Sequence, residues 1–284
     1  MATRKKPSIP PDVPEPDLAE DNDPIFDAVE AGEILSSWWD DLCVATGFLT
    51  RIPFGVPEKK AKGAVAAAMR AFPLVGAALG AAGGVVYGLA DGIGLSPFPS
   101  AFLALAAVVV LSGAMHEDGL ADTVDGFIGG SNKKNRLAIM HDSFIGAYGV
   151  LALVFSVGIR VAVLVSLADP GQVAAVLIAA QAVSRAGLPV IISNMKPARR
   201  SGLAVAAGRP SQDRVYASVA LGAALALLFL GPVAGLFALL AAAAIITVMM
   251  TLSCRLVGGY TGDVLGAAQQ ACEIAVLLAA AAAV

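Results

Sequence analysis

The sequence from residue 72 onward is dominated by apolar segments that are each about as long as a membrane-spanning helix. An α-helix needs about 20 mostly apolar residues to cross a hydrocarbon layer about 30 Å thick. The segments are 72–91, 98–115, 144–168, 172–194, 216–231, 233–253 and 265–284. Their many Ala and Gly residues allow helices to pack closely within lipid. We therefore predict an all-α fold, a polytopic transmembrane bundle of about seven spanning helices.

The composition excludes most other classes of protein. Of the 284 residues, 57% are hydrophobic and 14% are charged, whereas a soluble domain carries about 25% charged residues. With 19 Lys and Arg against 22 Asp and Glu, the chain lacks the basic excess of a nucleic-acid-binding protein. Its three cysteines lack the spacing of a metal site or a disulfide framework. We expect the lipid bilayer as a partner and no nucleic acid, and the composition is compatible with an oligomer.

The first 35 residues differ in character from the rest of the chain. They contain six prolines and nine acidic residues, and they offer too little apolar surface to offset the entropy lost on ordering. We therefore expect a disordered tail over 1–35 and a membrane-embedded domain over 36–284. The domain opens with an amphipathic stretch that contains Trp38 and Trp39. Paired Trp residues favour the membrane–water interface, so we expect an interfacial helix there.

The connecting loops alternate in charge along the chain. Together, 13 Lys and Arg residues lie in the loops 54–71, 131–142, 195–215 and 254–264. The intervening loops, 92–97, 169–171 and 231–232, contain none. Lys and Arg in short loops stay on the cytoplasmic side of a membrane. We therefore expect a multi-pass protein of the cell inner membrane whose basic loops face the cytoplasm.

After residue 92 acidic residues are scarce, and most of them fall in two clusters. The first cluster follows His116 and contains Glu117, Asp118, Asp122 and Asp125. In a helix the last three lie at positions i, i+4 and i+7 on one face. Neighbouring carboxylates repel each other unless a cation neutralises them, and ligation by oxygen alone suits Mg²⁺ or Mn²⁺ together with substrate phosphates. The cluster therefore predicts a site for a metal ion and a diphosphate.

Other interpretations of the first cluster stay open. A continuous helix over 101–128 would be ~42 Å long, so its acidic end would emerge at the cytoplasmic face. The same acids could form a solvated helix end, or they could belong to a transporter that coordinates a metal ion. His116 could serve as a metal ligand, a proton carrier or a hydrogen-bonded spacer.

Basic and polar residues accompany both clusters. The loop 129–136 offers flexible Gly-rich backbone with Lys133 and Arg136, which suits phosphate binding. Asp142 and Ser143 precede the next apolar segment, where they can cap a helix or help to seat an anion. Arg199 and Arg200 could set the topology or bind a ligand.

The second acidic cluster follows a Gly-rich turn at 258–262. Asp263 and Gln270 lie at positions i and i+7, on one side of the predicted helix. Glu273 lies about one turn deeper in the membrane, where an ionisable residue is usually paired. It could pair with a buried cation such as Arg160 or Arg185, or it could contact substrate.

These segments together resemble the cobalamin synthase family, the adenosylcobinamide-GDP ribazoletransferases. The residues that carry the resemblance are the runs 48–53, 72–76, 116–126, 142–143, 145–149 and 259–267 with Ser184, Arg185, Gln270 and Glu273. The resemblance extends from about residue 40 to the C-terminus, and the joint spacing of the motifs is far more specific than any single motif. The acidic N-terminal tail lies outside it.

The sequence departs from that family at one segment. The family usually reads Lys-Asp-Ser-Arg after the acidic cluster, whereas this chain reads His141-Asp142-Ser143-Phe144. Lys133, Lys134 and Arg136 lie nearby and can supply the missing positive charge. The acidic cluster also partly resembles the CDP-alcohol phosphotransferases, but their Ala-Arg after the first Asp-Gly is absent, because Asp122 follows Ala121.

The resemblance implies Mg²⁺-dependent transfer of the adenosylcobinamide-phosphate group from adenosylcobinamide-GDP to α-ribazole or its 5′-phosphate. The products would be adenosylcobalamin or its phosphate, and GMP. We expect metal ligation by Glu117, Asp118, Asp122 and Asp125, with His116 as a further catalytic residue. Substrate contacts are expected from Lys133, Arg136, Asp142, Ser143, Arg185, Asp263, Gln270 and Glu273. A CDP-alcohol phosphotransferase of lipid synthesis and a metal-coordinating transporter are the alternatives.

Overall fold

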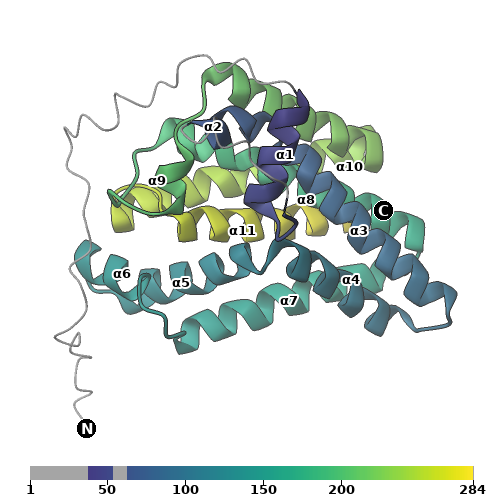
Figure 1. Cartoon of the computed structure of the whole chain (residues 1–284). Helices are drawn as coiled ribbons and strands as arrows, with labels where there is room; N and C mark the ends of the chain where they lie inside the picture. Colours follow the sequence, from purple (N-terminus) through teal and green to yellow (C-terminus); the bar gives the residue numbers. More distant parts are fainter. Residues whose placement is uncertain (1–37, 54–62, 284) are drawn as a thin grey trace, which may run out of the picture.

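The computed structural model describes residues 38–53 and 63–283, and in these ranges the chain is helical without a named strand. The predicted tail at 1–35 lies outside the described residues. The helices are α1 (Trp38–Leu49), α2 (Ala64–Ala68), η2 (Met69–Ala71), α3 (Phe72–Gly92), α4 (Pro97–Ser112), α5 (Met115–Gly129), α6 (Lys133–Ile139), α7 (Ala147–Leu167), α8 (Pro170–Asn194), α9 (Leu203–Ala207), α10 (Gln212–Val257) and α11 (Gly262–Ala281). The predicted all-α bundle is thereby confirmed (Figure 1).

Five of the described helices are long and apolar enough to cross a membrane, or six if α4 and α5 form one bent span. The predicted number is about seven because the sequence pattern divides this region into the segments 216–231 and 233–253. The count of five or six from the structure takes α10 as one helix of 46 residues. A straight helix of that length would extend ~69 Å, more than twice the hydrocarbon thickness.

Helix α10 is not straight, since it turns back on itself at Gly231. This glycine has φ 77° and Pro232 follows it, a combination that ends one helix and starts another. A Cβ added at Gly235 would lie 3.1 Å from the carbonyl oxygen of Ala226, so the two arms pack against each other. The predicted segments 216–231 and 233–253 are therefore the two arms of a helical hairpin.

The expectation of one continuous helix over 101–128 is wrong. The chain bends by 89° between α4 and α5, where Gly113 and Ala114 both adopt left-handed backbone conformations. Gly113 closes α4 as a glycine cap, with its N–H directed to carbonyls of the last turn. The bend takes the acidic helix α5 away from the direction of α4 (Figure 1).

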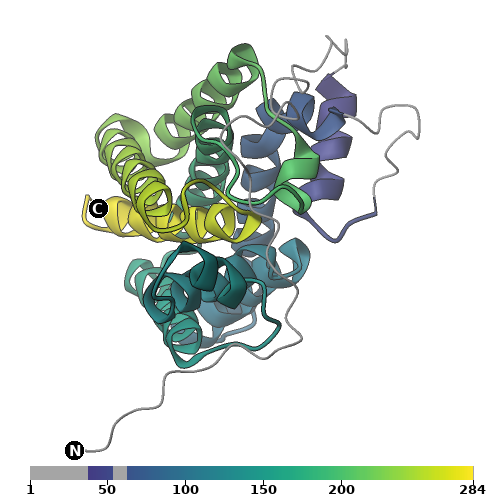
Figure 2. The ribbon, with the colours of Figure 1, turned by 90° about the vertical axis from the view of Figure 1, so that its left-hand side faces the viewer.

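Helix α8 lies at the centre of the bundle and packs against α3, α10 and α11. Figure 2 shows α11 between α10 on one side and α5 with α7 on the other. Small residues allow the closest of these contacts. Gly76, Gly80 and Gly84 of α3 lie against the backbone of α8, where added Cβ atoms would overlap α8 atoms. Close backbone approach through small residues is the packing expected within lipid.

This contact gives a prediction with a control in the same helix. Gly76→Ala would press a methyl group onto the carbonyl oxygen of Gln181, so we expect a loss of about 1–3 kcal/mol of unfolding free energy. At Gly88 nothing lies within 4 Å of an added Cβ, and Gly88→Ala should be neutral or stabilising by up to about 1 kcal/mol. Thermal unfolding in detergent measures both. Equal stability of the two variants would contradict the α3–α8 packing.

Three of the predicted basic loops meet at one end of the bundle, shown at the left of Figure 1 near α6 and α9. The backbone of Tyr260 exchanges hydrogen bonds of 3.0 and 2.8 Å with Lys196 and Ala198. An Nη of Arg199 donates to the carbonyl oxygen of Leu137 at 2.8 Å. A Cβ at Gly258 would lie 2.8 Å from the Nζ of Lys133. The loops 131–142, 195–215 and 254–264 thus form one basic end.

Candidate functional site

The two acidic clusters of the sequence come together where α5 crosses α11. The crossing depends on two glycines, because the Cα of Gly119 lies 3.2 Å from the position of a Cβ added at Gly266. An added Cβ at Gly119 would in turn lie 2.8 Å from the carbonyl oxygen of Asp263. As a result, the carboxylate of Asp122 lies close enough to those of Asp118 and Asp263 for their charges to interact.

A pocket opens beside this crossing, at the basic end of the bundle. Its polar wall contains His116, Asp118, Arg199 and Asp263. Apolar side chains from α1, η2, α3, α8 and α9 supply most of the remaining lining: Phe48, Leu49, Met69, Phe72, Leu188, Ile192, Leu203, Ala204 and Val205. The combination of apolar surface with a few polar groups is typical of a ligand-binding pocket.

Two further groups set the charge and hydrogen bonding of the polar wall. An Nη of Arg199 forms an ion pair with the carboxylate of Asp263 at 3.5 Å. Burial raises the pKa of the Tyr260 hydroxyl to about 12, so this pocket-lining group stays protonated at neutral pH and can donate a hydrogen bond. The pocket therefore presents two carboxylates, a guanidinium and a neutral donor.

The three aspartates of the α5 face have different environments. Asp118 is exposed, Asp122 is half-buried and Asp125 is buried. Asp125 accepts hydrogen bonds from the backbone N–H groups of Gly146 at 2.6 Å and Gly149 at 2.9 Å. Both N–H groups lie at the start of α7, where the helix itself offers no carbonyl acceptor. Asp125 therefore caps α7 from a neighbouring helix, and the capping role considered for Asp142 and Ser143 is wrong.

This cap predicts a stability effect that separates two aspartates. Asp125→Ala should lower the unfolding free energy by about 1.5–3 kcal/mol, because it leaves buried N–H donors of α7 without their charged acceptor. Asp142 is exposed, and within the described part of the chain it accepts one hydrogen bond, from the N–H of Phe144 at 3.3 Å, so Asp142→Ala should change stability by less than about 0.5 kcal/mol. Denaturant unfolding checks both values. Unchanged stability of Asp125→Ala would contradict the capping role.

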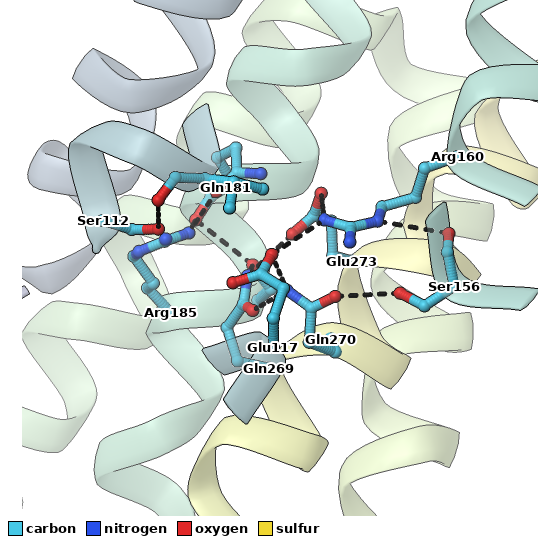
Figure 3. A network of polar contacts seen from close by, with 11 residues as sticks. Ser112, Glu117, Ser156, Arg160, Gln181, Arg185, Gln269, Gln270 and Glu273 are labelled. Carbon is cyan, nitrogen blue, oxygen red and sulfur yellow. Dashed lines mark hydrogen bonds and ion pairs between the residues drawn. The ribbon is translucent and has the colours of Figure 1, made fainter. Parts of the chain in front are cut away.

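Glu117 does not point toward the pocket with Asp118. It enters a buried polar network between α5, α7, α8 and α11 (Figure 3). Arg160 of α7 is fully buried, and its Nη1 lies 3.3 Å from a carboxylate oxygen of Glu117 and 3.3 Å from one of Glu273. The predicted pairing of Glu273 with a buried cation is present, and Arg160 is that cation.

Side-chain amides and hydroxyls complete this network (Figure 3). Gln270 donates to Glu117 at 3.0 Å and accepts from the hydroxyl of Ser156 at 3.0 Å. Gln269 donates to Glu273 at 2.9 Å and to the hydroxyl of Ser184 at 3.0 Å. Glu117, Gln270 and Glu273 are thus hydrogen-bonded to or ion-paired with other side chains of the bundle, and none of them lines the pocket.

Arg185 extends the network on the α8 side. It is buried and donates to the side chain and the carbonyl oxygen of Gln181, one turn earlier in α8. Sequence reasoning did not single out Gln181, Ser156 or Gln269. A polar residue inside an otherwise apolar span was the available signal, since such a residue needs a hydrogen-bonding partner within the bundle.

The remaining predicted residues lie on or next to α6, outside the pocket lining. Lys133 is exposed beside the turn at Gly258, and Arg136 donates to the carbonyl oxygen of Leu256 at 3.4 Å. Asp142 and Ser143 are exposed in the segment before α7. Lys133 and Arg136 therefore belong to the basic end of the bundle.

Comparison with known proteins agrees with these features. Residues 41–281 match the family model described as cobalamin-5-phosphate synthase. A protein of Bradyrhizobium diazoefficiens is 43% identical over 85% of this chain and 93% of its own length, and one of Azorhizobium caulinodans is 45% identical over 84% and 94%. Both are named adenosylcobinamide-GDP ribazoletransferase. No solved structure matches the chain significantly. The chain belongs to the cobalamin-5-phosphate synthase family, whose model covers all of its described helices but the first residues of α1.

Proposed function

We propose that this membrane transferase of cobalamin biosynthesis moves the adenosylcobinamide-phosphate group from adenosylcobinamide-GDP to a free ribose hydroxyl of α-ribazole or of α-ribazole 5′-phosphate, with Mg²⁺. The relatives named adenosylcobinamide-GDP ribazoletransferase support this reaction class. The crossing of α5 and α11 is the main observation that supports placing the active site there. It brings Asp118, Asp122 and Asp263 together beside a pocket at the basic end.

The residues at the crossing fit Mg²⁺ by their chemistry. All three offer carboxylate oxygens, the ligand type that Mg²⁺ prefers. Among the described residues no group of three or more His, Cys, Asp or Glu side chains forms a ready-made metal cluster. Mg²⁺ usually keeps several waters and takes only one or two carboxylates together with substrate phosphates. The open arrangement of Asp118, Asp122 and Asp263 supports a site that a diphosphate completes.

The roles of the residues differ from the set expected from spacing alone. Asp118, Asp122 and Asp263 would hold Mg²⁺, which when bound neutralises diphosphate charge and orients it. Asp125 and Glu117 already have protein partners and would act by holding α5 in place. Arg199 at the pocket and Lys133 and Arg136 at the basic end would attract the phosphates.

The chemistry that this arrangement supports is an in-line substitution at phosphorus. The acceptor hydroxyl forms a new P–O bond at the cobinamide-side phosphorus and releases its proton to solvent. The bond between that phosphorus and the bridging oxygen breaks, and this oxygen leaves with GMP. Enzymes accelerate such reactions mainly by positioning the reactants and neutralising the charge of the phosphates. None of the pocket residues is needed as a covalent nucleophile.

A donor comparison tests the proposed function directly. Purified protein in detergent is given α-ribazole and Mg²⁺ with either adenosylcobinamide-GDP or CDP-diacylglycerol. We expect GMP and adenosylcobalamin from the first donor and no CMP from the second. Release of CMP, or solute movement in sealed vesicles without any nucleotide product, would instead support one of the two alternative classes.

The basic end is proposed to face the cytoplasm of a bacterial inner membrane, because Lys and Arg in short loops stay on that side. The exposed Ser131 lies in this end, so Ser131→Cys should react with a membrane-impermeant maleimide only after the cells are opened. A cysteine placed at Gly94, in the loop at the opposite end, should react in intact cells once the outer membrane is permeabilised. The reverse pattern would contradict the orientation.

A further inference from the structure

The acidic groups of the pocket beside the crossing come from α5 and α11, whereas most of its apolar lining comes from α1, η2, α3, α8 and α9, so we divide it into a polar and an apolar half. The carboxylates of Asp118 and Asp263 lie in one half, next to Arg199. The other half is apolar and includes Phe48 and Phe72, whose rings stack with centroids 5.9 Å apart. A ligand that fits this pocket must therefore join a polar end to a compact apolar end.

His116 supplies a polar contact within this pocket. The residue is only 3% exposed and lines the pocket. Its Nε2 is buried and has no hydrogen-bond partner among the described residues. A buried polar atom without a partner costs free energy unless a ligand or water satisfies it. The imidazole therefore adds an unsatisfied polar group to the residues that line the pocket.

The size of the pocket restricts the ligand further. Its volume is about 240 Å³, near the lower limit of ligand pockets, which begins at roughly 300 Å³. A corrin macrocycle with its side chains is far too large for it. A guanine nucleotide would place a polar base against apolar side chains, which is unfavourable without hydrogen-bonding partners.

We propose that this pocket binds the acceptor nucleoside, with its aromatic base in the apolar half and its ribose toward His116 and the carboxylates. The assignment rests on the proposed function and specifies which of the two substrates occupies the pocket. The donor then approaches from the open side of the crossing, where Asp118 is exposed. The acceptor hydroxyl would meet the diphosphate beside Asp118 and Asp263.

A matched pair of variants in α9 tests this assignment. Ala204 is 6% exposed and lines the pocket, whereas Ala206, two residues later, is exposed and lies outside it. Ala204→Leu fills part of the apolar half, so we expect the KM for α-ribazole to rise about tenfold or more. The KM for adenosylcobinamide-GDP should change less than about twofold. Ala206→Leu should leave both values near those of the wild type.

The outcomes separate this inference from the proposed function. A wild-type protein that makes no product from either nucleoside form overturns the proposed function. An active wild type with a rise in the donor KM of Ala204→Leu, or with no change in either KM, overturns the pocket assignment alone.

A second measurement does not depend on filling the pocket. Ser201 is exposed at the pocket lining, so Ser201→Cys can be labelled with a maleimide and followed by peptide mass spectrometry apart from Cys43, Cys254 and Cys272. We expect α-ribazole alone to slow labelling at position 201, and not at a cysteine placed at Ala206. Protection by the donor alone, without protection by α-ribazole, would overturn the assignment.

Discussion

Asp122→Asn is expected to lower the rate of GMP release by at least ~100-fold, which corresponds to about 2.7 kcal/mol of transition-state stabilisation. The substitution keeps the size of the side chain and removes one of the three charges at the crossing of α5 and α11. A site with fewer carboxylates binds Mg²⁺ more weakly, so the Mg²⁺ concentration that gives half-maximal activity should also rise. Steady-state assays over a Mg²⁺ series measure both effects.

The control for this prediction is another aspartate at the same end of the bundle. Asp213 is exposed in the first turn of α10 and does not line the pocket. Asp213→Asn should leave the rate and the Mg²⁺ dependence unchanged. If Asp122→Asn folds normally and keeps both wild-type values, Asp122 does not hold the metal ion.

Arg160→Leu is expected to have the largest effect on stability, a loss of about 3–5 kcal/mol of unfolding free energy. The guanidinium is fully buried and lies 3.3 Å from both Glu117 and Glu273. Its removal leaves the buried carboxylates of Glu117 and Glu273 without the cation that ion-pairs with them, while only the charge of Arg185 on α8 still acts on both. Removing one side of a buried ion pair is strongly destabilising. Thermal or denaturant unfolding in detergent measures the loss.

A triple variant shows whether the loss comes from charge. Adding Glu117→Gln and Glu273→Gln to Arg160→Leu removes the uncompensated carboxylates while keeping side chains of similar size. Replacing a whole buried ion pair is often close to neutral, so the triple variant should recover at least about half of the lost free energy. A triple variant that is less stable than Arg160→Leu would show that packing of the arginine, and not its charge, stabilises this region.

Much of the secondary structure follows from the sequence because apolar segments of this length span lipid as helices, in which every backbone N–H and C=O group is hydrogen-bonded. The predicted segments at 72–91 and 172–194 nearly coincide with α3 and α8. The break between α4 and α5 could not be predicted in the same way. It depends on left-handed conformations at Gly113 and Ala114, and alanine has no intrinsic preference for such a conformation. Only the tertiary contacts of α5 stabilise it there.

The candidate site was only partly predictable, for a related reason. Helical spacing correctly placed Asp118 and Asp122 on one helix and drew attention to Asp263. Spacing cannot reveal which of several equivalent carboxylates already has a partner. Asp125 accepts hydrogen bonds at the N-terminus of α7, and Glu117 forms an ion pair with Arg160. Both interactions join α5 to a different helix, so the local sequence does not reveal them.

The contrast between Glu117 and Asp118 has a consequence for how α5 is oriented. The two carboxylates are neighbours in the sequence, so their directions around the helix axis differ by about 100°. One is held by Arg160 and Gln270 inside the bundle, and the other is exposed at the pocket. A rotation of α5 by less than a third of a turn would exchange their surroundings. The interior ion pair therefore fixes the rotational setting of α5, and with it the direction in which Asp118 faces the pocket.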